Sequence, residues 1–110
     1  MLHRDRTILV KISEEISIAI EMMDNISLVE FKSNEILKRA VCMTVINIGE
    51  LVKNLSDELR KEYNFIPWKS IAGFRDIAAH KYQTLKMQDV YITVTNDFHN
   101  LKNNIDKILN

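Results

Sequence analysis

Apolar residues recur at every third or fourth position along most of this chain, which is the spacing of one face of an α-helix. The first stripe predicts a helix over residues 4–25 and consists of Ile8, Ile12, Ile16, Ala19 and Met23. The second predicts a long helix that begins after Ser33, which would cap it, and consists of Leu37, Val41, Thr44, Ile48, Leu51 and Leu55. The third predicts a final helix over residues 88–109 and consists of Tyr91, Val94, Phe98, Leu101, Ile105 and Ile108.

Shorter helical segments fill the intervals between these stripes. Ser27 and Glu30 have the spacing of a capping box and predict a short helical turn. A second short amphipathic segment, residues 57–63, follows Ser56.

The pattern breaks at residues 64–67, because proline cannot donate a backbone hydrogen bond and restricts the residue before it. Pro67 suits the first turn of a new helix, which would carry Trp68 into the core and extend over about 71–79. Residues 90–95 are rich in strand-forming side chains, but the final helical stripe runs through them and an isolated strand would have no partner. We therefore expect no strand.

Composition agrees with a helical protein. Two glycines and one proline in 110 residues are too few for the turns of a β domain. We expect an all-α, up-and-down bundle of four main helices plus short helical turns, forming a single domain over residues 1–110. Cys42 lies in an apolar run and is expected to be a small buried side chain.

Charge and hydropathy limit the possible partners and location. Fifteen Lys and Arg balance fifteen Asp and Glu, so RNA could be contacted only by a local basic patch or a groove between two copies. One cysteine cannot form an internal disulfide, and the N-terminal residues lack a signal-peptide core. No apolar run approaches the ~20 residues that span a bilayer. We expect a cytoplasmic protein without a membrane segment.

The chemistry is concentrated between Arg75 and Tyr82. Arg75 offers a planar set of donors suited to phosphate, and His80 can accept and release a proton near neutral pH. On a surface helix, however, Arg and His are usually only solvated. Residues five apart on a regular helix are separated by about 140°, so Arg75 and His80 would not share a face, whereas Tyr82 would nearly align with Arg75 if the helix continued.

Two arrangements would bring Arg75 and His80 to one phosphate. The helix could unwind after Ala79 and turn His80 back across its end. Alternatively, two copies could meet across a two-fold axis, so that Arg75 of one serves His80 of the other. The spacing alone does not choose between them.

Several segments together resemble the HepT-like branch of the HEPN superfamily. They are Ile48-Gly49-Glu50, residues 56–63 (SDELRKEY), residues 66–76 (IPWKSIAGFRD) and His80-Lys81-Tyr82. The resemblance implies a helical homodimer, able to assemble further with its partner, that cleaves RNA without a metal or other cofactor. It also implies a toxin silenced by a nucleotidyltransferase-type antitoxin that adds AMP to a tyrosine.

Carried onto this chain, the resemblance makes Arg75 and His80 the catalytic pair and Tyr82 the modification site. Asp76 occupies the supporting polar position after the arginine, where the branch often has Asn. An aspartate at this position keeps an acceptor but lacks the amide donor of asparagine. Glu50 is a second supporting residue that would pair with Arg75 inside the bundle, although an ordinary structural ion pair is equally compatible. The histidines and Cys42 have no ligand-like spacing, so we expect no metal site.

Other interpretations stay open at this point. One is a catalytically inactive HEPN-like helical dimer that binds a nucleotide or its nucleotidyltransferase partner. Another is a plain helical oligomer without a ligand. A basic rim could be formed by five residues, Lys53, Arg60, Lys61, Lys69 and Lys81. Because acidic residues are interleaved with some of them, a mixed-charge surface is the better interpretation.

Overall fold

The computed structural model describes all residues, 1–110, and they form helices and no strand. The long helices are α1 (His3–Met22), α3 (Glu35–Lys53), α5 (Trp68–His80) and a C-terminal helix built from α6 (Met87–Ile92), a π-helical turn η2 (Thr93–Asp97) and α7 (Phe98–Leu109). Short segments join them: α2 (Leu28–Ser33), α4 (Asp57–Glu62) and a 3-10 turn η1 (Tyr82–Thr84). The all-α bundle expected from the sequence is confirmed.

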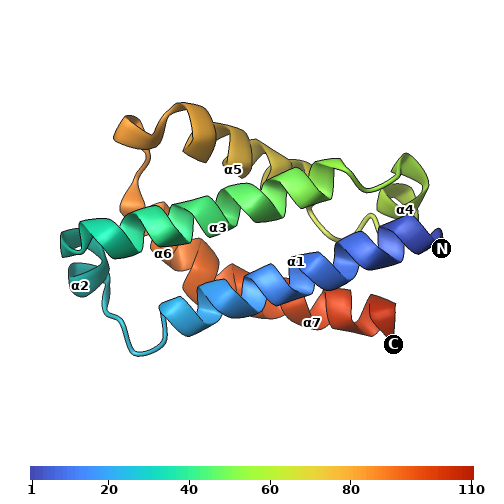
Figure 1. Cartoon of the computed structure of the whole chain (residues 1–110), viewed down its shortest axis with the longest axis horizontal. Coiled ribbons are helices and arrows are strands. Elements are labelled where there is room, and N and C mark those ends of the chain that lie inside the picture. The colour runs from blue at the N-terminus through green and yellow to red at the C-terminus, as the bar shows by residue number, and fades with distance from the viewer.

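α3 is the central helix of the bundle. It packs against α1 on one side and against α5 on the other, while α1 also packs against α7 (Figure 1). Both termini and α4 lie at one end of the molecule, and α2 lies at the other (Figure 1). α5 is therefore an outer helix whose contacts are mainly with α3, and one of its faces stays free.

The predicted apolar stripes form the core. Most of the completely inaccessible side chains come from α1, α3 and the C-terminal helix, and they include Ile12, Ile16, Val41, Ile48, Val94 and Ile105. Trp68 is also buried and donates its indole N–H to the carbonyl of Tyr63 at 3.1 Å. The role of Trp68 as an apolar anchor is confirmed.

One of the two predicted caps is present, and the structure adds a cap at Ser56 that was not predicted. Ser27 and Glu30 form the capping box at α2, and the hydroxyl of Ser56 accepts from the amide of Leu59 at α4. The prediction for Ser33 is wrong. Its hydroxyl donates back to carbonyls of α2, and Asn34 caps α3 by accepting from the amide of Leu37 at 3.0 Å.

Some helix boundaries also differ from the prediction. α1 ends three residues early, and Asn25 then adopts a φ of 58°, a left-handed conformation that does not continue a helix. α5 begins at Trp68 rather than near Ile71, because Pro67 needs no amide partner and can precede the first turn directly.

The C-terminal helix contains a π-helical turn that the regular stripe did not predict. Residues 90–95 are helical, as expected, but Thr93 and Thr95 donate their hydroxyls to the carbonyls of Asp89 and Tyr91. Such bonds compete with backbone amides for the same acceptors and loosen the helix locally.

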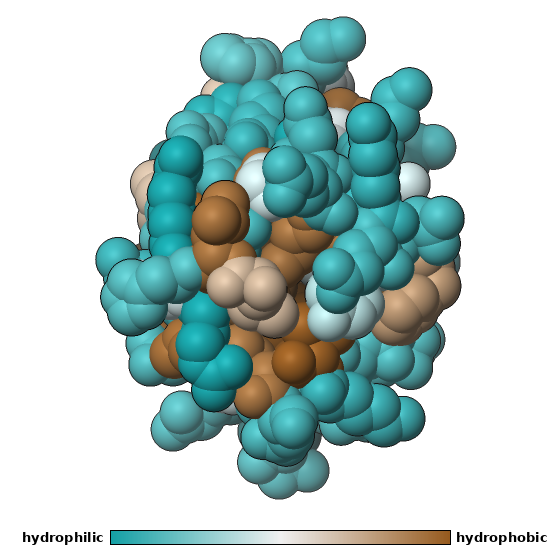
Figure 2. Space-filling model, turned by 90° about the vertical axis from the view of Figure 1, so that its right-hand side faces the viewer, coloured by the Kyte–Doolittle hydropathy of each residue, from teal (hydrophilic) through white to brown (hydrophobic).

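The end of the molecule that carries α4 and both termini has apolar surface at its centre, ringed by hydrophilic side chains (Figure 2). Exposed apolar residues in this region are Met1, Leu2 and Phe65, and two shallow depressions meet at Tyr63. None of the helices is both long enough and apolar enough to cross a membrane.

Candidate active site

Arg75 lies at a close approach of α5 to α3, opposite Gly49. A Cβ built on Gly49 of α3 would lie 2.1 Å from Cβ of Arg75, so this crossing requires glycine. Nη2 of Arg75 lies 3.1 Å from Oε2 of Glu50. The expected Arg75–Glu50 pair is therefore present, but Glu50 is exposed and the pair lies at the edge of the α3–α5 interface rather than inside the bundle.

Asp76 connects Arg75 to a second cation. Its Oδ1 accepts from Nζ of Lys53 at 2.7 Å and from Nη1 of Arg75 at 3.2 Å. The hydrogen bond from Lys53, and then that from Arg75, hold the pKa of Asp76 below its usual value. Two carboxylates thus hold the guanidinium of Arg75, and its Nε is buried without a partner. A phosphate would compete with those two carboxylates for the guanidinium.

His80 is the last residue of α5 and is exposed. The helix does not unwind after Ala79, so the arrangement that depended on such unwinding is contradicted. Within one chain, Arg75 and His80 are separated by about 140° around the helix and about 7.5 Å along it. The arrangement between two copies is compatible with this geometry and stays a prediction.

The free face of α5 carries Gly73, Ile77 and His80 at steps of four and three. A Cβ built on Gly73 would meet nothing within 4 Å, so no packing inside the chain requires glycine there. Ile77 is 49% exposed. This face, called the Gly73–His80 face, carries a glycine and an exposed isoleucine beside an exposed imidazole.

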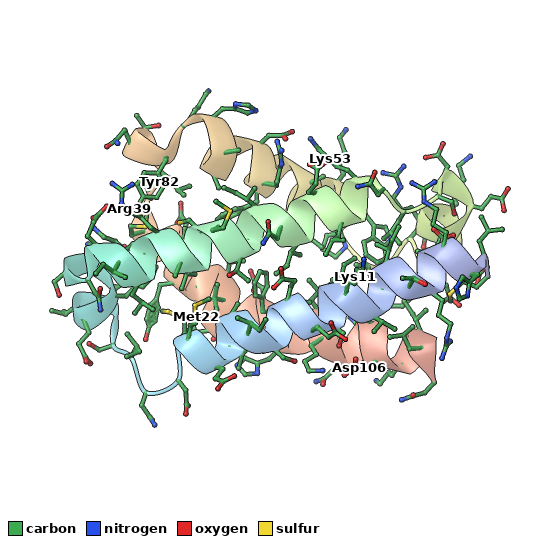
Figure 3. All side chains as sticks on the ribbon, viewed as in Figure 1. Lys11, Met22, Arg39, Lys53, Tyr82 and Asp106 are labelled. Carbon is green, nitrogen blue, oxygen red and sulfur yellow. The ribbon has the colours of Figure 1, made fainter.

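Tyr82 does not align with Arg75, because α5 ends before it and Tyr82 belongs to η1. Its hydroxyl donates to Oε1 of Glu35 at 3.3 Å, and Cζ of Arg39 lies 5.3 Å from the centre of its ring. Figure 3 shows Tyr82 beside Arg39 at one end of α3, with Lys53 at the other end. Arg39 and Glu50 are eleven residues apart, about 16 Å along α3.

A cavity of about 360 Å³ lies between α5 and the C-terminal helix, with Val45 and Ile48 of α3 at its floor. Ser70 and Thr93 contribute hydroxyls, and Asp97 contributes the single charged group. Its other polar lining residues are carboxamides spaced four apart, namely Asn96, Asn100 and Asn104. No lysine or arginine lines the cavity, so it does not favour a phosphate.

Metal-ligating groups do not gather in this structure. No three side chains of His, Cys, Asp or Glu lie together so that they could hold a metal ion. Cys42 is buried, as expected, and burial raises the pKa of its thiol to about 11. The expected mixed-charge surface is supported by Lys53, which pairs with Asp76, and by Arg60, which pairs with Asp57.

Sequence reasoning missed three residues near the site. Gly49 stood in the segment that resembles the family, but nothing local indicated that it contacts Arg75. Glu35 and Arg39 have the spacing of a helical ion pair, which is a detectable signal. Their contact with Tyr82, 47 residues beyond Glu35, has no such signal.

Comparison with known proteins matches residues 12–108 to the family model described as Ribonuclease HepT-like. The chain is 34% identical over 104 residues to a "Putative RNase" of Caldanaerobacter subterraneus subsp. tengcongensis, covering 94% of this chain and 93% of the relative. It is 39% identical over 80 residues to a "Gamma-glutamylcyclotransferase and putative RNase" of Methanocaldococcus jannaschii, covering 73% of this chain but 36% of that longer protein. It is 28% identical over 99 residues to a "Probable ribonuclease HepT" of Thermococcus cleftensis, covering 86% of this chain and 90% of the relative. No solved structure matches the chain.

Proposed function

The chain belongs to the HepT-like ribonuclease family, and from that premise we propose that it is a metal-independent endoribonuclease and the toxin of a toxin–antitoxin pair. The observation that carries the proposal is the position of Arg75 and His80 on one outer helix. Arg75 is held in a defined orientation by Glu50 and Asp76, while His80 is exposed beside a free helix face. A fixed cation and an accessible imidazole are the groups that phosphodiester cleavage by an internal nucleophile needs.

In the proposed reaction, the 2′-hydroxyl of RNA attacks the adjacent phosphorus. The bond to the 5′-oxygen breaks, which leaves a 2′,3′-cyclic phosphate and a free 5′-hydroxyl. His80 takes the proton of the nucleophile or gives one to the leaving oxygen, a contribution typically of about 10²–10⁴-fold. Arg75 binds the non-bridging oxygens and stabilises the charge that grows there.

We propose that the site is completed between two copies. Within one chain the two groups point to different faces of α5, so a second chain must supply one of them. The Gly73–His80 face favours this contact, because a glycine that no packing inside the chain requires permits close approach from outside. Glycine in a helix otherwise costs about 1 kcal/mol relative to alanine.

Tyr82 is the proposed site of AMP addition by a nucleotidyltransferase-type antitoxin. It is partly exposed in η1, outside the regular part of α5, and its hydroxyl makes a single long hydrogen bond. These features support access by a modifying enzyme.

One observation favours the alternative, a catalytically inactive helical dimer that binds a nucleotide or its partner. Both terminal nitrogens of Arg75 are already paired with carboxylates, and one of these is Asp76. If RNA cannot displace Asp76, cleavage fails while the fold and dimer persist.

The test is complementation between two inactive variants, Arg75→Ala and His80→Ala. In a mixed dimer, one site would lose both groups and the other would keep both, so mixing restores about a quarter of wild-type cleavage. Mixing two samples of the same variant is the control. Absence of restored cleavage would contradict a shared site. Equal cleavage of RNA and of a strand with a 2′-deoxy scissile position, with a chelator present, would exclude the chemistry itself.

A further inference from the structure

Tyr82 belongs to a charged cluster at the first turns of α3 that neither the catalytic proposal nor the bundle explains. Oε1 of Glu35 lies 2.9 Å from Nε of Arg39 and accepts from the hydroxyl of Tyr82. Oε2 of the same carboxylate lies 3.0 Å from Nζ of Lys38. One carboxylate therefore serves three donors, two of which are cations.

The cluster carries one more positive than negative charge. The hydrogen bond from Lys38 keeps the pKa of Glu35 below its usual value, so this side chain is an anion at neutral pH. Burial and the nearby Glu35 raise the pKa of Tyr82, so its phenol is neutral and donates its proton. The carboxylate of Glu35 thus holds the cations of Lys38 and Arg39 beside the hydroxyl of Tyr82, and another anion could take its place.

On the proposed modification of Tyr82, we propose that Lys38 and Arg39 form the binding site for the phosphodiester of the attached nucleotide, and that Glu35 occupies this site beforehand. Arg39 already lies over the ring that would carry the phosphate. A phosphodiester on the phenolic oxygen carries one negative charge and two free oxygens, which suit the donors of an arginine beside a lysine. The new anion replaces Glu35 as their partner.

The modification balances as follows. The phenolic oxygen of Tyr82 forms a bond to the α-phosphorus of ATP, and the bond from that phosphorus to the bridging oxygen breaks. Pyrophosphate leaves, and the phenolic proton passes to solvent. The tyrosine becomes an anionic diester at the position where its hydroxyl had met the carboxylate of Glu35.

This site implies how the modification silences the chain. Tyr82 lies two residues after His80 and beneath Arg39. Arg75, in contrast, pairs with Glu50, which lies about 16 Å from Arg39 along α3. The nucleotide on Tyr82 therefore need not reach Arg75. Fixing Tyr82 to α3 holds the end of α5, so that His80 cannot adjust to RNA and the nucleotide covers its surroundings.

The experiment measures how fast an added nonspecific phosphodiesterase removes AMP from the modified chain. Wild type, Arg39→Gln, Glu35→Gln and Arg60→Gln are each modified with ATP by a purified nucleotidyltransferase of the proposed antitoxin type, then followed by intact mass. Arg60 is the matched control, because it is an arginine in an exposed helical ion pair at the opposite end of the molecule.

Arg39→Gln and Glu35→Gln are expected to change the rate of AMP release in opposite directions. Arg39→Gln should release AMP about two- to fivefold faster, the range for solvent-exposed ion pairs. Glu35→Gln should release it more slowly, because the competing anion is gone, and Arg60→Gln should match wild type. Mere destabilisation of α3 would accelerate release in both cluster variants, and that result would overturn the site.

The outcomes also separate this inference from the function on which it rests. If wild type gains no mass, the modification of Tyr82 fails, and the phosphate site fails with it. If wild type is modified but Arg39→Gln and Glu35→Gln behave like Arg60→Gln, only the site formed by Lys38 and Arg39 is overturned.

Discussion

At the scale of single residues, immediate surroundings decide what each side chain can do. Arg75 and His80 lie on the same helix, yet two carboxylates orient the first and solvent surrounds the second. Orientation is useful for a group that binds charge, whereas access is useful for a group that moves protons. The residue environments therefore fit the roles that we propose.

Cys42 shows how burial, as the largest influence, changes a titratable group. Burial raises the pKa of its thiol from 9.0 to about 11, so the folded chain holds that proton more tightly than the unfolded chain. The resulting stability is fully present below the ordinary thiol pKa and is lost as the pH rises through about 11.

We predict that the stability advantage of wild type over Cys42→Ala shrinks by about 1–2 kcal/mol at high pH. The measurement is urea unfolding of both proteins at about pH 7 and about pH 10.5. Comparing the two proteins removes the contribution of the lysines, which titrate in the same range. An unchanged difference would mean that the thiolate is already accessible in the folded chain.

At the scale of elements, helix ends are fixed by single side chains with backbone contacts. Ser56 caps α4, and the buried carboxylate of Asp5 in α1 in turn accepts from its amide at 2.9 Å and from its hydroxyl at 2.7 Å. This cap therefore also joins two helices. Ser27 caps α2 through an exposed capping box without such a second contact.

We predict that Ser56→Ala lowers the free energy of unfolding by about 1–2 kcal/mol, because it removes a cap and a donor to a buried carboxylate. Ser27→Ala serves as the matched control and should cost about 0.5–1 kcal/mol. Chemical denaturation of both variants provides the comparison. Equal losses would show that Asp5 gains little from the hydroxyl of Ser56.

At the scale of the whole molecule, the α3–α5 crossing positions the candidate site. Gly49 allows the stem of Arg75 to lie directly against α3, and the guanidinium then reaches Glu50. Gly73 lies on the opposite, free face of α5, where a side chain would meet nothing. The two glycines of this chain therefore have different roles.

We predict that Gly49→Ala destabilises the protomer by about 1–3 kcal/mol, because the new methyl group forces α5 away from α3. Gly73→Ala should stabilise the protomer by about 0.5–1 kcal/mol, since alanine favours a helix. Both are measured by thermal unfolding at a concentration where the chain is monomeric. Sedimentation should then show weaker dimers for Gly73→Ala; dimers as strong as those of wild type would exclude this face as the contact.

The local pattern was sufficient for most of the helices and the core. Apolar spacing predicted the stripes of α1, α3 and the C-terminal helix, because burial of one helix face depends on residues near each other in the chain. Helix ends were less predictable. Ser33 and Asn34 are both good caps, and only the structure shows that Asn34 accepts from α3 while Ser33 donates to α2.

The sequence by itself determined that this chain is helical, which faces are buried, and which residues could carry chemistry. The tertiary structure alone decided which of those residues meet. It placed Arg75 against Gly49 and Glu50, Tyr82 against Glu35 and Arg39, and His80 away from Arg75. Such meetings depend on how whole helices dock and where they end, and no local spacing encodes the distance between residues that are far apart in the chain.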